Sequence, residues 1–262
     1  MNIVVCVKYV PDAQSERTFS EDKTTERESV DGLLSELDEY AVEEALTVAQ
    51  EHDGEVTVLT MGPDEAATAI KKSLQMGVHQ GIHVNDPAIA GSDSVGTSLV
   101  LAKAIEKIGQ ETPVDLILTG LASTDGVMSV VPAMLAERLG LPQVTFASEL
   151  SIDGGTVRIR RDGDVASETI EAALPALVSV TDQINDPRYP SFKGIMAAKK
   201  KPVQQWSLSD IGVDASDVGL DAAWTRVLSI TQRPPRSQGE VVTDEGSGGQ
   251  ALADFLTSHK FA

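Results

Sequence analysis

The sequence predicts an α/β fold: a doubly wound, mainly parallel sheet with an added β-hairpin and an extended C-terminal arm. Short apolar, β-branched runs alternate with helical patterns along the first two-thirds of the chain, which is typical of right-handed βαβ units. Farther on, two stretches of period-two alternation flank an Asp-Gly-Asp turn at 162–164 and indicate a hairpin. The last part of the chain is polar and rich in glycine, proline and aspartate, so it cannot build a core of its own.

The strands and helices follow in order along the chain. Apolar runs predict buried strands at residues 2–7, 55–59, 82–84, 114–119 and 176–181. Helical spacing of apolar residues predicts helices at 38–51, 64–76, 92–108 and 127–139, and a short one near 250–258. The hairpin strands are 156–161 and 167–172. Because the strands are this apolar, we expect helices on both faces of the sheet. The chain is therefore divided into an α/β domain at 1–211 and an arm at 212–262.

Composition limits the class of protein. The chain has 262 residues, of which 41% are hydrophobic, and this is enough to bury a core. No run of about 18 apolar residues predicts a membrane span, and the first residues lack the basic region of a signal peptide. The single cysteine, Cys6, rules out an internal disulfide and a multi-cysteine metal or iron–sulfur site. We expect a cytoplasmic protein.

Charge excludes two classes of partner. There are 40 acidic and 21 basic residues, which gives a net charge of −19. Such a surface repels nucleic acid and anionic lipid. The acidic residues are spread along the chain rather than held in a tail, which suits a salt-rich cytosol where repulsion is screened. We interpret this as the surface of a halophile's protein; the alternative is an ordinary acidic cytoplasmic protein.

Catalytic and metal-binding motifs are missing from the sequence. It has neither a G-x-G-x-x-G nor a G-x-x-x-x-G-K-[ST] pattern, and its four histidines lack a metal-ligand spacing. Cys6 lies in an apolar run, so we expect a buried packing residue rather than a nucleophile. The sequence therefore favours binding over catalysis.

The loops that follow the strands are the first place to look for a ligand. Ligands on doubly wound sheets bind outside the carboxyl ends of the strands, which here are followed by residues 8–12, 60–63 and 120–125. The loop at 119–126 has small residues and opens onto a helix, so its N–H groups could cradle a phosphate. A plain turn in which Asp125 or Ser129 caps the helix explains the same residues. The sequence leaves both interpretations open.

Residues 187–196 are the most unusual segment. Two prolines, two aromatic residues and two cations precede three lysines at 199–201. On so acidic a protein, a basic and apolar exposed loop is a candidate docking site. The alternative is a solvated loop with a lysine-capped helix end.

Several blocks resemble the beta subunits of electron transfer flavoproteins. The most specific are N-D-P-R-Y at 185–189 and G-I-M-A-A-K-K-K at 194–201. The resemblance extends nearly end to end, through V-K-Y-V-P-D at 7–12, D-E-Y-A-V-E-E-A at 38–45, L-T-M-G-P at 59–63, L-Q-M-G at 74–77 and L-P-Q-V-T-F-A-S at 141–148.

The resemblance implies an electron carrier rather than a stand-alone enzyme. Such a subunit pairs with an alpha subunit that holds the redox-active FAD, and the heterodimer passes electrons from dehydrogenases, such as acyl-CoA dehydrogenases, towards a quinone reductase. The α/β domain would bind AMP, or a second FAD in electron-bifurcating members, and the arm would pack on the alpha subunit. The competing hypothesis is a stand-alone α/β protein that binds or hydrolyses an adenine nucleotide.

The resemblance also implies site residues. The matching nucleotide contacts are Cys6, Ser35, Leu37, Asp38, Met61, Gly120, Leu121, Ala122, Ser123, Thr124, Asp125, Ser129, Val130 and Val131. The matching partner-docking residues lie within 188–199 and are Arg188, Tyr189, Phe192, Lys193, Ile195 and Met196.

A further segment, residues 90–98, resembles the electron-bifurcating branch and adds Asp93 and Thr97 as contacts of a second FAD. An ordinary capping sequence, with Ser92 or Asp93 as the N-cap, is the alternative.

Two departures from the family's pattern matter. Val130 and Val131 stand where many members carry glutamine followed by threonine or valine, so a polar phosphate ligand is lost. Phe192 stands where leucine is usual, which indicates a different redox partner.

Overall fold

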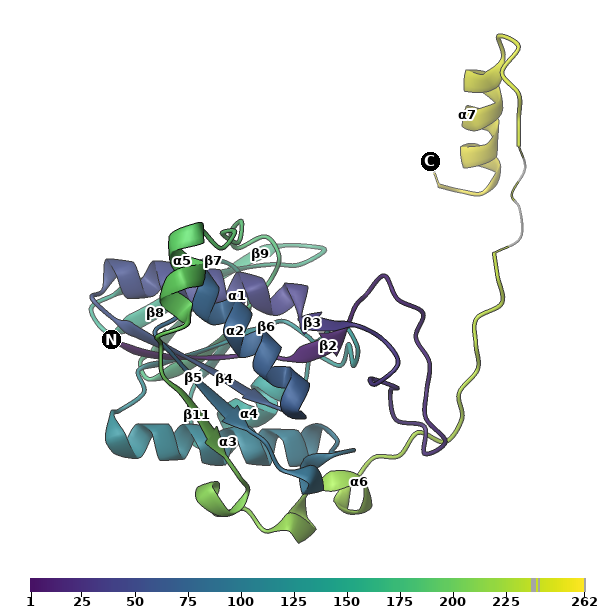
Figure 1. The fold of residues 1–262 in the computed structure, drawn as a ribbon. Coiled ribbons are helices and arrows are strands. Elements are labelled where there is room, and N and C mark those ends of the chain that lie inside the picture. The colour runs from purple at the N-terminus through teal and green to yellow at the C-terminus, as the bar shows by residue number, and fades with distance from the viewer. Residues whose placement is uncertain (237–238, 240, 262) are drawn as a thin grey trace. The chain divides into compact units, whose positions relative to one another are not determined.

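The computed structural model describes residues 1–236, 239 and 241–261 (Figure 1). The chain divides into two compact units, Met1–Val227 and Leu228–Ala262. The first contains the sheet and its covering helices. The second contains one helix, α7 (Gly248–Ser258), close to the short helix expected at the end of the chain.

The first unit is built on a nine-stranded sheet in the order β11-β5-β4-β1-β6-β10-β7-β8-β9. The strands from β11 to β7 run parallel, and β8 and β9 continue the sheet antiparallel to β7. A separate antiparallel pair is formed by two short strands, β2 and β3. The bounds are β1 (Asn2–Cys6), β2 (Tyr9–Pro11), β3 (Gly32–Leu34), β4 (Glu55–Met61), β5 (Gln80–Val84), β6 (Leu116–Gly120), β7 (Gln143–Asp153), β8 (Thr156–Asp162), β9 (Ser167–Ala173), β10 (Ala176–Val180) and β11 (Val203–Trp206).

Helices cover both faces of the sheet, as the apolar strands predicted. Helices α1 and α2 pack on one face, and α3 and α4 pack on the other (Figure 1). The helices of the first unit are α1 (Glu36–Glu51), α2 (Ala67–Met76), α3 (Ser94–Glu111), α4 (Val131–Leu139), α5 (Phe192–Ala198) and α6 (Gly219–Ala222), with 3₁₀ turns η1 (Asp64–Ala66), η2 (Pro87–Ile89), η3 (Ser209–Ile211) and η4 (Ala215–Asp217). The predicted α/β class with its added hairpin is confirmed.

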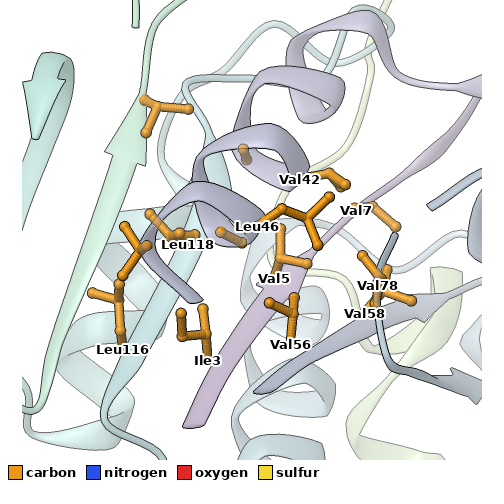
Figure 2. Close-up of a cluster of buried hydrophobic side chains, with 14 of the residues drawn as sticks. Ile3, Val5, Val7, Val42, Leu46, Val56, Val58, Val78, Leu116 and Leu118 are labelled. Atoms are coloured by element: carbon orange, nitrogen blue, oxygen red, sulfur yellow. The ribbon is translucent and has the colours of Figure 1, made fainter. Parts of the chain in front are cut away.

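Strand β1 lies at the centre and supplies both cores. Because side chains alternate along a strand, Ile3 and Val5 pack under α1 and α2, whereas Val4 and Cys6 pack under α3 and α4. Figure 2 shows Val5 against Val42 and Leu46 of α1. Burying two apolar layers in this way is the main stabilisation of the unit.

The chain changes its direction of winding at β1. It adds β4 and then β5 on one side of β1 and returns through α3 to place β6 on the other side. The carboxyl ends of β1 and β6 therefore adjoin where the strand order reverses, and this is where doubly wound sheets bind ligands.

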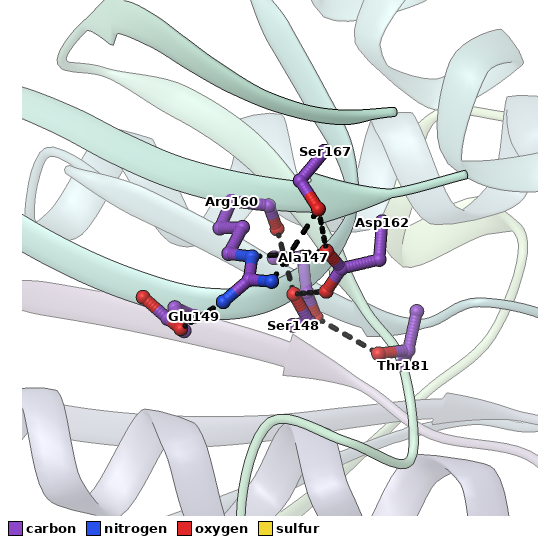
Figure 3. A network of polar contacts seen from close by, with 7 residues as sticks. All are labelled: Ala147, Ser148, Glu149, Arg160, Asp162, Ser167 and Thr181. Carbon is purple, nitrogen blue, oxygen red and sulfur yellow. Dashed lines mark hydrogen bonds and ion pairs between the residues drawn. The ribbon is translucent and has the colours of Figure 1, made fainter. Parts of the chain in front are cut away.

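The hairpin strands β8 and β9 are joined to β7 by a polar network (Figure 3). Both carboxylate oxygens of Asp162 are used: Ser148 donates to one, while Ser167 and Arg160 donate to the other. These hydrogen bonds, led by those from Ser148 and Ser167, lower the pKa of Asp162. Arg160 also donates to Glu149 over 2.9 Å. These polar contacts add to the apolar packing of the hairpin, whose Val157 and Ile159 are buried in the core.

Three expectations differ from the structure for local reasons. Helix α4 begins at Val131 rather than at 127, because Val127 and Ser129 have φ angles of 51° and 56°, which no helix accommodates. Strand β7 was not expected. Phe146, with a φ of 63°, lies in an irregularity of the pairing with β10 between Val144 and Ala147, which interrupts the regular alternation of the strand. The segment at 187–196 was expected to be an exposed loop, but from Phe192 it forms the short helix α5. Ser191 is the N-cap of this helix, and its Oγ accepts the backbone N–H of Gly194.

The start of the expected arm packs on the first unit. Val213 and Val218 are buried in the same core as α3 and α4. The first compact unit ends at Val227, beyond residue 211, where the α/β domain was expected to end. In the described part of the chain, no helix has both the length and the apolar character that crossing a membrane requires.

Candidate functional site

The carboxyl ends of β1 and β6 meet the first turn of α1 at one edge of the sheet. Cys6 ends β1 and pairs with Thr119, and Gly120 ends β6. A Cβ atom at Gly120 would lie 2.6 Å from Asp38 Oδ1 and 2.8 Å from the Leu37 carbonyl oxygen. Only glycine therefore allows α1 to approach β6 this closely. The structure thus gathers four of the predicted residues, Cys6, Leu37, Asp38 and Gly120.

Asp38 is a buried carboxyl at the centre of this edge. Its Oδ2 accepts the backbone N–H of Lys8 over 2.7 Å. Burial raises the pKa of Asp38 from its ordinary 3.8 to about 7, although the hydrogen bond and the charge of Lys8 oppose the rise. Asp38 can therefore exchange a proton near neutral pH.

Asp125 is a second carboxyl beside it, with the opposite character. It accepts hydrogen bonds from the ammonium of Lys8, over 3.0 Å, and from the guanidinium of Arg27. Burial alone would raise its pKa, but the two cations hold the pKa of Asp125 well below its usual range. Arg27 lies between β2 and β3, so this ion pair fastens the segment between those strands to the sheet edge. Neither Lys8 nor Arg27 was among the predicted contacts.

Four buried polar atoms near this edge have no hydrogen-bond partner among the described residues. They are Ser35 Oγ, Thr119 Oγ1, Thr124 Oγ1 and an Nη atom of Arg27. Ser35 stands at the N-cap of α1, where a serine hydroxyl usually bonds the helix, yet its hydroxyl makes no such bond. Buried polar groups without partners are rare in proteins. Together they can satisfy a ligand that carries several hydrogen-bond donors and acceptors.

The loop between β6 and α4 has an apolar tip. Val127 and Met128 are 69% and 60% exposed. Val130 is the N-cap of α4 and offers no side-chain hydrogen bond, and a proline follows at the start of the helix. Neither Asp125 nor Ser129 caps α4, so the plain-turn interpretation is wrong in that detail. The predicted contacts Leu121, Ala122, Ser123, Thr124, Ser129, Val130 and Val131 all lie partly buried along this loop and the first residue of α4.

Two sulfur-containing residues, Cys6 and Met61, end neighbouring strands at this edge of the sheet. Cys6 is buried, as expected, and burial followed by the charge of Asp38 raises the pKa of its thiol to about 12. The thiol is therefore protonated at neutral pH and acts as a packing group. Met61 ends β4, the other neighbour of β1, and packs against the same core as Cys6.

The segment at 90–98 is tied to a later part of the chain. Asp93 Oδ1 accepts the N–H groups of Val95 and Gly96, so the interpretation of Asp93 as the N-cap of α3 is confirmed. Its Oδ2 accepts the N–H groups of Trp224 and Thr225 and the Thr225 hydroxyl. Both oxygens are thus engaged within the chain. Thr97, the other residue predicted for a second flavin, lies in the first turn of α3.

The predicted docking residues divide into two groups. Tyr189 and Phe192 are 93% and 81% exposed. Lys193, Ile195 and Met196 are exposed beside them. Arg188 instead turns inward and forms a bidentate ion pair with Glu43 of α1. The sequence placed Glu43 only within the expected helix and the family-like block at 38–45, and nothing there pointed to Arg188 as its partner.

Comparison with known proteins gives a consistent result. The model of the family described as "Electron transfer flavoprotein domain" matches residues 23–211. A protein of Mycobacterium tuberculosis (strain ATCC 25618 / H37Rv) named "Electron transfer flavoprotein subunit beta" is 46% identical, over 99% of this chain and 98% of its own. A protein of the same name from Clostridium acetobutylicum is 35% identical over 92% of both chains. The "Caffeyl-CoA reductase-Etf complex subunit CarD" of Acetobacterium woodii is 36% identical over 98% of this chain and 97% of its own.

Proposed function

The chain belongs to the electron transfer flavoprotein family and serves electron transfer as a beta-type subunit, and from this premise we propose what it contributes. It holds an adenine nucleotide at the carboxyl ends of β1 and β6. It presents residues 188–199 to electron-donating dehydrogenases, such as acyl-CoA dehydrogenases. It pairs with an alpha subunit that carries most contacts to the redox-active FAD, and the heterodimer delivers electrons towards a quinone reductase.

One observation carries the nucleotide proposal: the cluster of unpartnered, buried hydroxyls at Ser35, Thr119 and Thr124 beside Gly120. A ribose or a phosphate supplies the partners that these hydroxyls lack. Arg27, with one buried Nη atom free, adds a donor for an anion. FAD contains an AMP moiety, so the same residues suit AMP and the adenylate half of a second FAD.

The choice between AMP and a second FAD depends on the segment at 90–98. Its likeness to the electron-bifurcating branch, and the relative named as part of a caffeyl-CoA reductase complex, favour a second FAD. Against this, both oxygens of Asp93 already bond within the chain, so a flavin that used Asp93 would have to displace Trp224 and Thr225. AMP requires no such displacement.

The nucleotides released on denaturing the purified heterodimer test the proposal. One FAD and one AMP per heterodimer would support the adenylate site with AMP, and two FAD would support flavin-based bifurcation. One FAD and no other nucleotide would refute the site. Thr124→Val removes a hydroxyl at nearly constant volume and should lower nucleotide content. The matched control, Thr169→Val on exposed β9, should leave nucleotide content unchanged. If the second nucleotide is FAD, Thr97→Val should also lower flavin content.

The strongly acidic composition of the chain leads to a proposal about the salt concentration in which the protein works. With a net charge of −19, the chain suits a salt-rich cytoplasm in which cations screen its carboxylates. Thermal unfolding in low and in molar KCl tests this: the midpoint should rise with salt by several degrees or more. A midpoint that is independent of salt would favour an ordinary acidic protein.

A further inference from the structure

The segment that contains the docking residues is fastened to α1 at its start. The guanidinium of Arg188 donates to both carboxylate oxygens of Glu43, over 2.7 and 2.8 Å, and its backbone N–H donates to the same group over 3.1 Å. The Asn185 amide donates to the Tyr40 carbonyl oxygen and to Glu44 Oε2, over 3.1 and 3.0 Å. Two neighbouring glutamates of α1 thus bind both ends of the N-D-P-R sequence.

The end of the segment is fastened to α2. The Lys201 ammonium donates to the carbonyl oxygens of Leu74 and Gly77, over 3.0 and 2.9 Å, at the end of that helix. Between the two attachments, Gly194 lies against α2 so closely that a Cβ atom there would be 2.5 Å from the Gln75 carbonyl oxygen. The segment from Asn185 to Lys201 is therefore held at its start, at Gly194 and at its end, and none of these attachments involves an exposed aromatic side chain.

The cations of the segment fall into two groups: those that bond within the chain and those that are exposed. Arg188 and Lys201 are used within the chain. Lys193, Lys199 and Lys200 are exposed and form no salt bridge within the described residues. The side chain of Glu43 is only 11% exposed, so its charge would be costly to bury without Arg188. A bidentate arginine–carboxylate pair also fixes orientation, which a lysine cannot do.

We propose that Glu43 and Arg188 are positioning residues for partner docking: their ion pair orients the segment so that Tyr189 and Phe192 face the partner. This rests on the proposed docking function. The pair sets the angle at which the aromatic side chains leave the surface, without contacting the partner. The partner then offers an apolar pocket for Phe192, surrounded by carboxylates that meet the free lysines.

Steady-state electron transfer from a cognate acyl-CoA dehydrogenase to the heterodimer tests the pair. Glu43→Gln should raise the Michaelis constant for the heterodimer about tenfold. It should leave kcat within about twofold, because the flavin and its surroundings are untouched. Flavin content should not change. Glu51→Gln, the same substitution at an exposed position on the same helix, is the control and should leave the Michaelis constant unaltered.

A charge exchange distinguishes positioning from direct contact. Arg188→Glu alone should raise the Michaelis constant, and the double variant Glu43→Arg, Arg188→Glu should restore most of the loss. If the double variant keeps the raised Michaelis constant, the proposal is overturned, because Arg188 would then contact the partner directly. Should these variants unfold, Arg188→Lys keeps the charge but not the bidentate bond and should give a smaller rise.

The effects of Glu43→Gln and Phe192→Ala together show whether the ion pair or the whole docking proposal fails. An unchanged Michaelis constant in Glu43→Gln overturns the positioning role. If Phe192→Ala has no effect either, the docking function itself fails. If Phe192→Ala alone weakens transfer, only the role of the pair is lost.

Discussion

The backbone N–H of Lys8, the second residue after β1, donates a 2.7 Å hydrogen bond to Asp38 Oδ2 in the first turn of α1. The ammonium of the same lysine lies 3.0 Å from Asp125 Oδ1. One residue thus joins two carboxyls whose pKa values are displaced in opposite directions, upward for Asp38 and downward for Asp125. Carboxyls that differ in this way are typical of ligand sites.

We predict that Asp38 makes the stability of the protein depend on pH. Its pKa in the folded chain, about 7, exceeds its ordinary 3.8, so the folded chain binds a proton that the unfolded chain has released. Proton binding to Asp38 therefore adds to the stability of the folded chain. This stabilisation is complete below pH 3.8 and is lost as the pH rises towards 7. Asp38→Asn should therefore gain stability relative to the natural protein as the pH rises through this range. Thermal unfolding midpoints at several pH values check this, with the exposed Asp164→Asn as control. Parallel curves for the Asp38 variant and the natural protein would contradict the prediction.

The ion pairs of Asp125 should contribute to stability at neutral pH. Its pKa is depressed, so the contribution is present above the ordinary 3.8 and is lost as the pH falls below it. Lys8 and Arg27 are 44% and 32% exposed, and solvent screens them. Asp125→Asn should therefore cost about 1–2 kcal/mol rather than the larger cost of breaking a fully buried pair. Urea unfolding measures the loss. Glu106→Gln, which breaks an exposed pair with Lys103, should cost less than about 0.5 kcal/mol. Equal losses in the two variants would argue against a special role for Asp125.

Phe192 should act in docking and not in folding. Its side chain is 81% exposed, so Phe192→Ala removes little buried area. The unfolding midpoint and the flavin content of the heterodimer should stay the same. Electron delivery from the dehydrogenase should slow by about tenfold or more, since a buried aromatic anchor often dominates a small interface. Stopped-flow reduction of the flavin measures this. Val165→Ala, at an exposed valine of the hairpin, is the control. Unaltered transfer would remove the segment from the docking proposal.

The end of the chain should be cut by protease unless the alpha subunit is bound. Arg226, Arg233 and Arg236 are exposed and lie outside helices and strands. Limited trypsin digestion of the isolated chain should cleave after Arg226 and Arg236 and leave the sheet and its covering helices intact. Arg233 should resist, because Pro234 follows it and trypsin does not cut before proline. Addition of the alpha subunit should suppress the cleavage, because an arm that packs on a partner loses access to the protease. Equal cleavage with and without the alpha subunit would contradict the expected role of the arm.

Much of the fold could be predicted because its signals are local. The run from Asn2 to Cys6 is apolar at every position but the first, and this predicts a central strand wherever the rest of the chain goes. Strands β4, β6 and β10 are also mainly apolar, and the helices between them show helical spacing of apolar residues. The deviations at Val127 and Phe146 could not be predicted, because a positive φ in such residues is imposed by the surrounding structure rather than by the residue itself.

The sequence by itself determined the class of the fold, the family and the loops in which a nucleotide site could lie. Only the tertiary structure decided which side chains meet there. Lys8 and Asp125 are 117 residues apart, Arg27 and Asp125 are 98 apart, and Glu43 and Arg188 are 145 apart. Hydrophobic periodicity is a property of neighbouring residues, and it reports which face of an element is buried. The partner of a charged side chain depends on how elements far apart in the chain pack, and that is decided when the two cores close around β1.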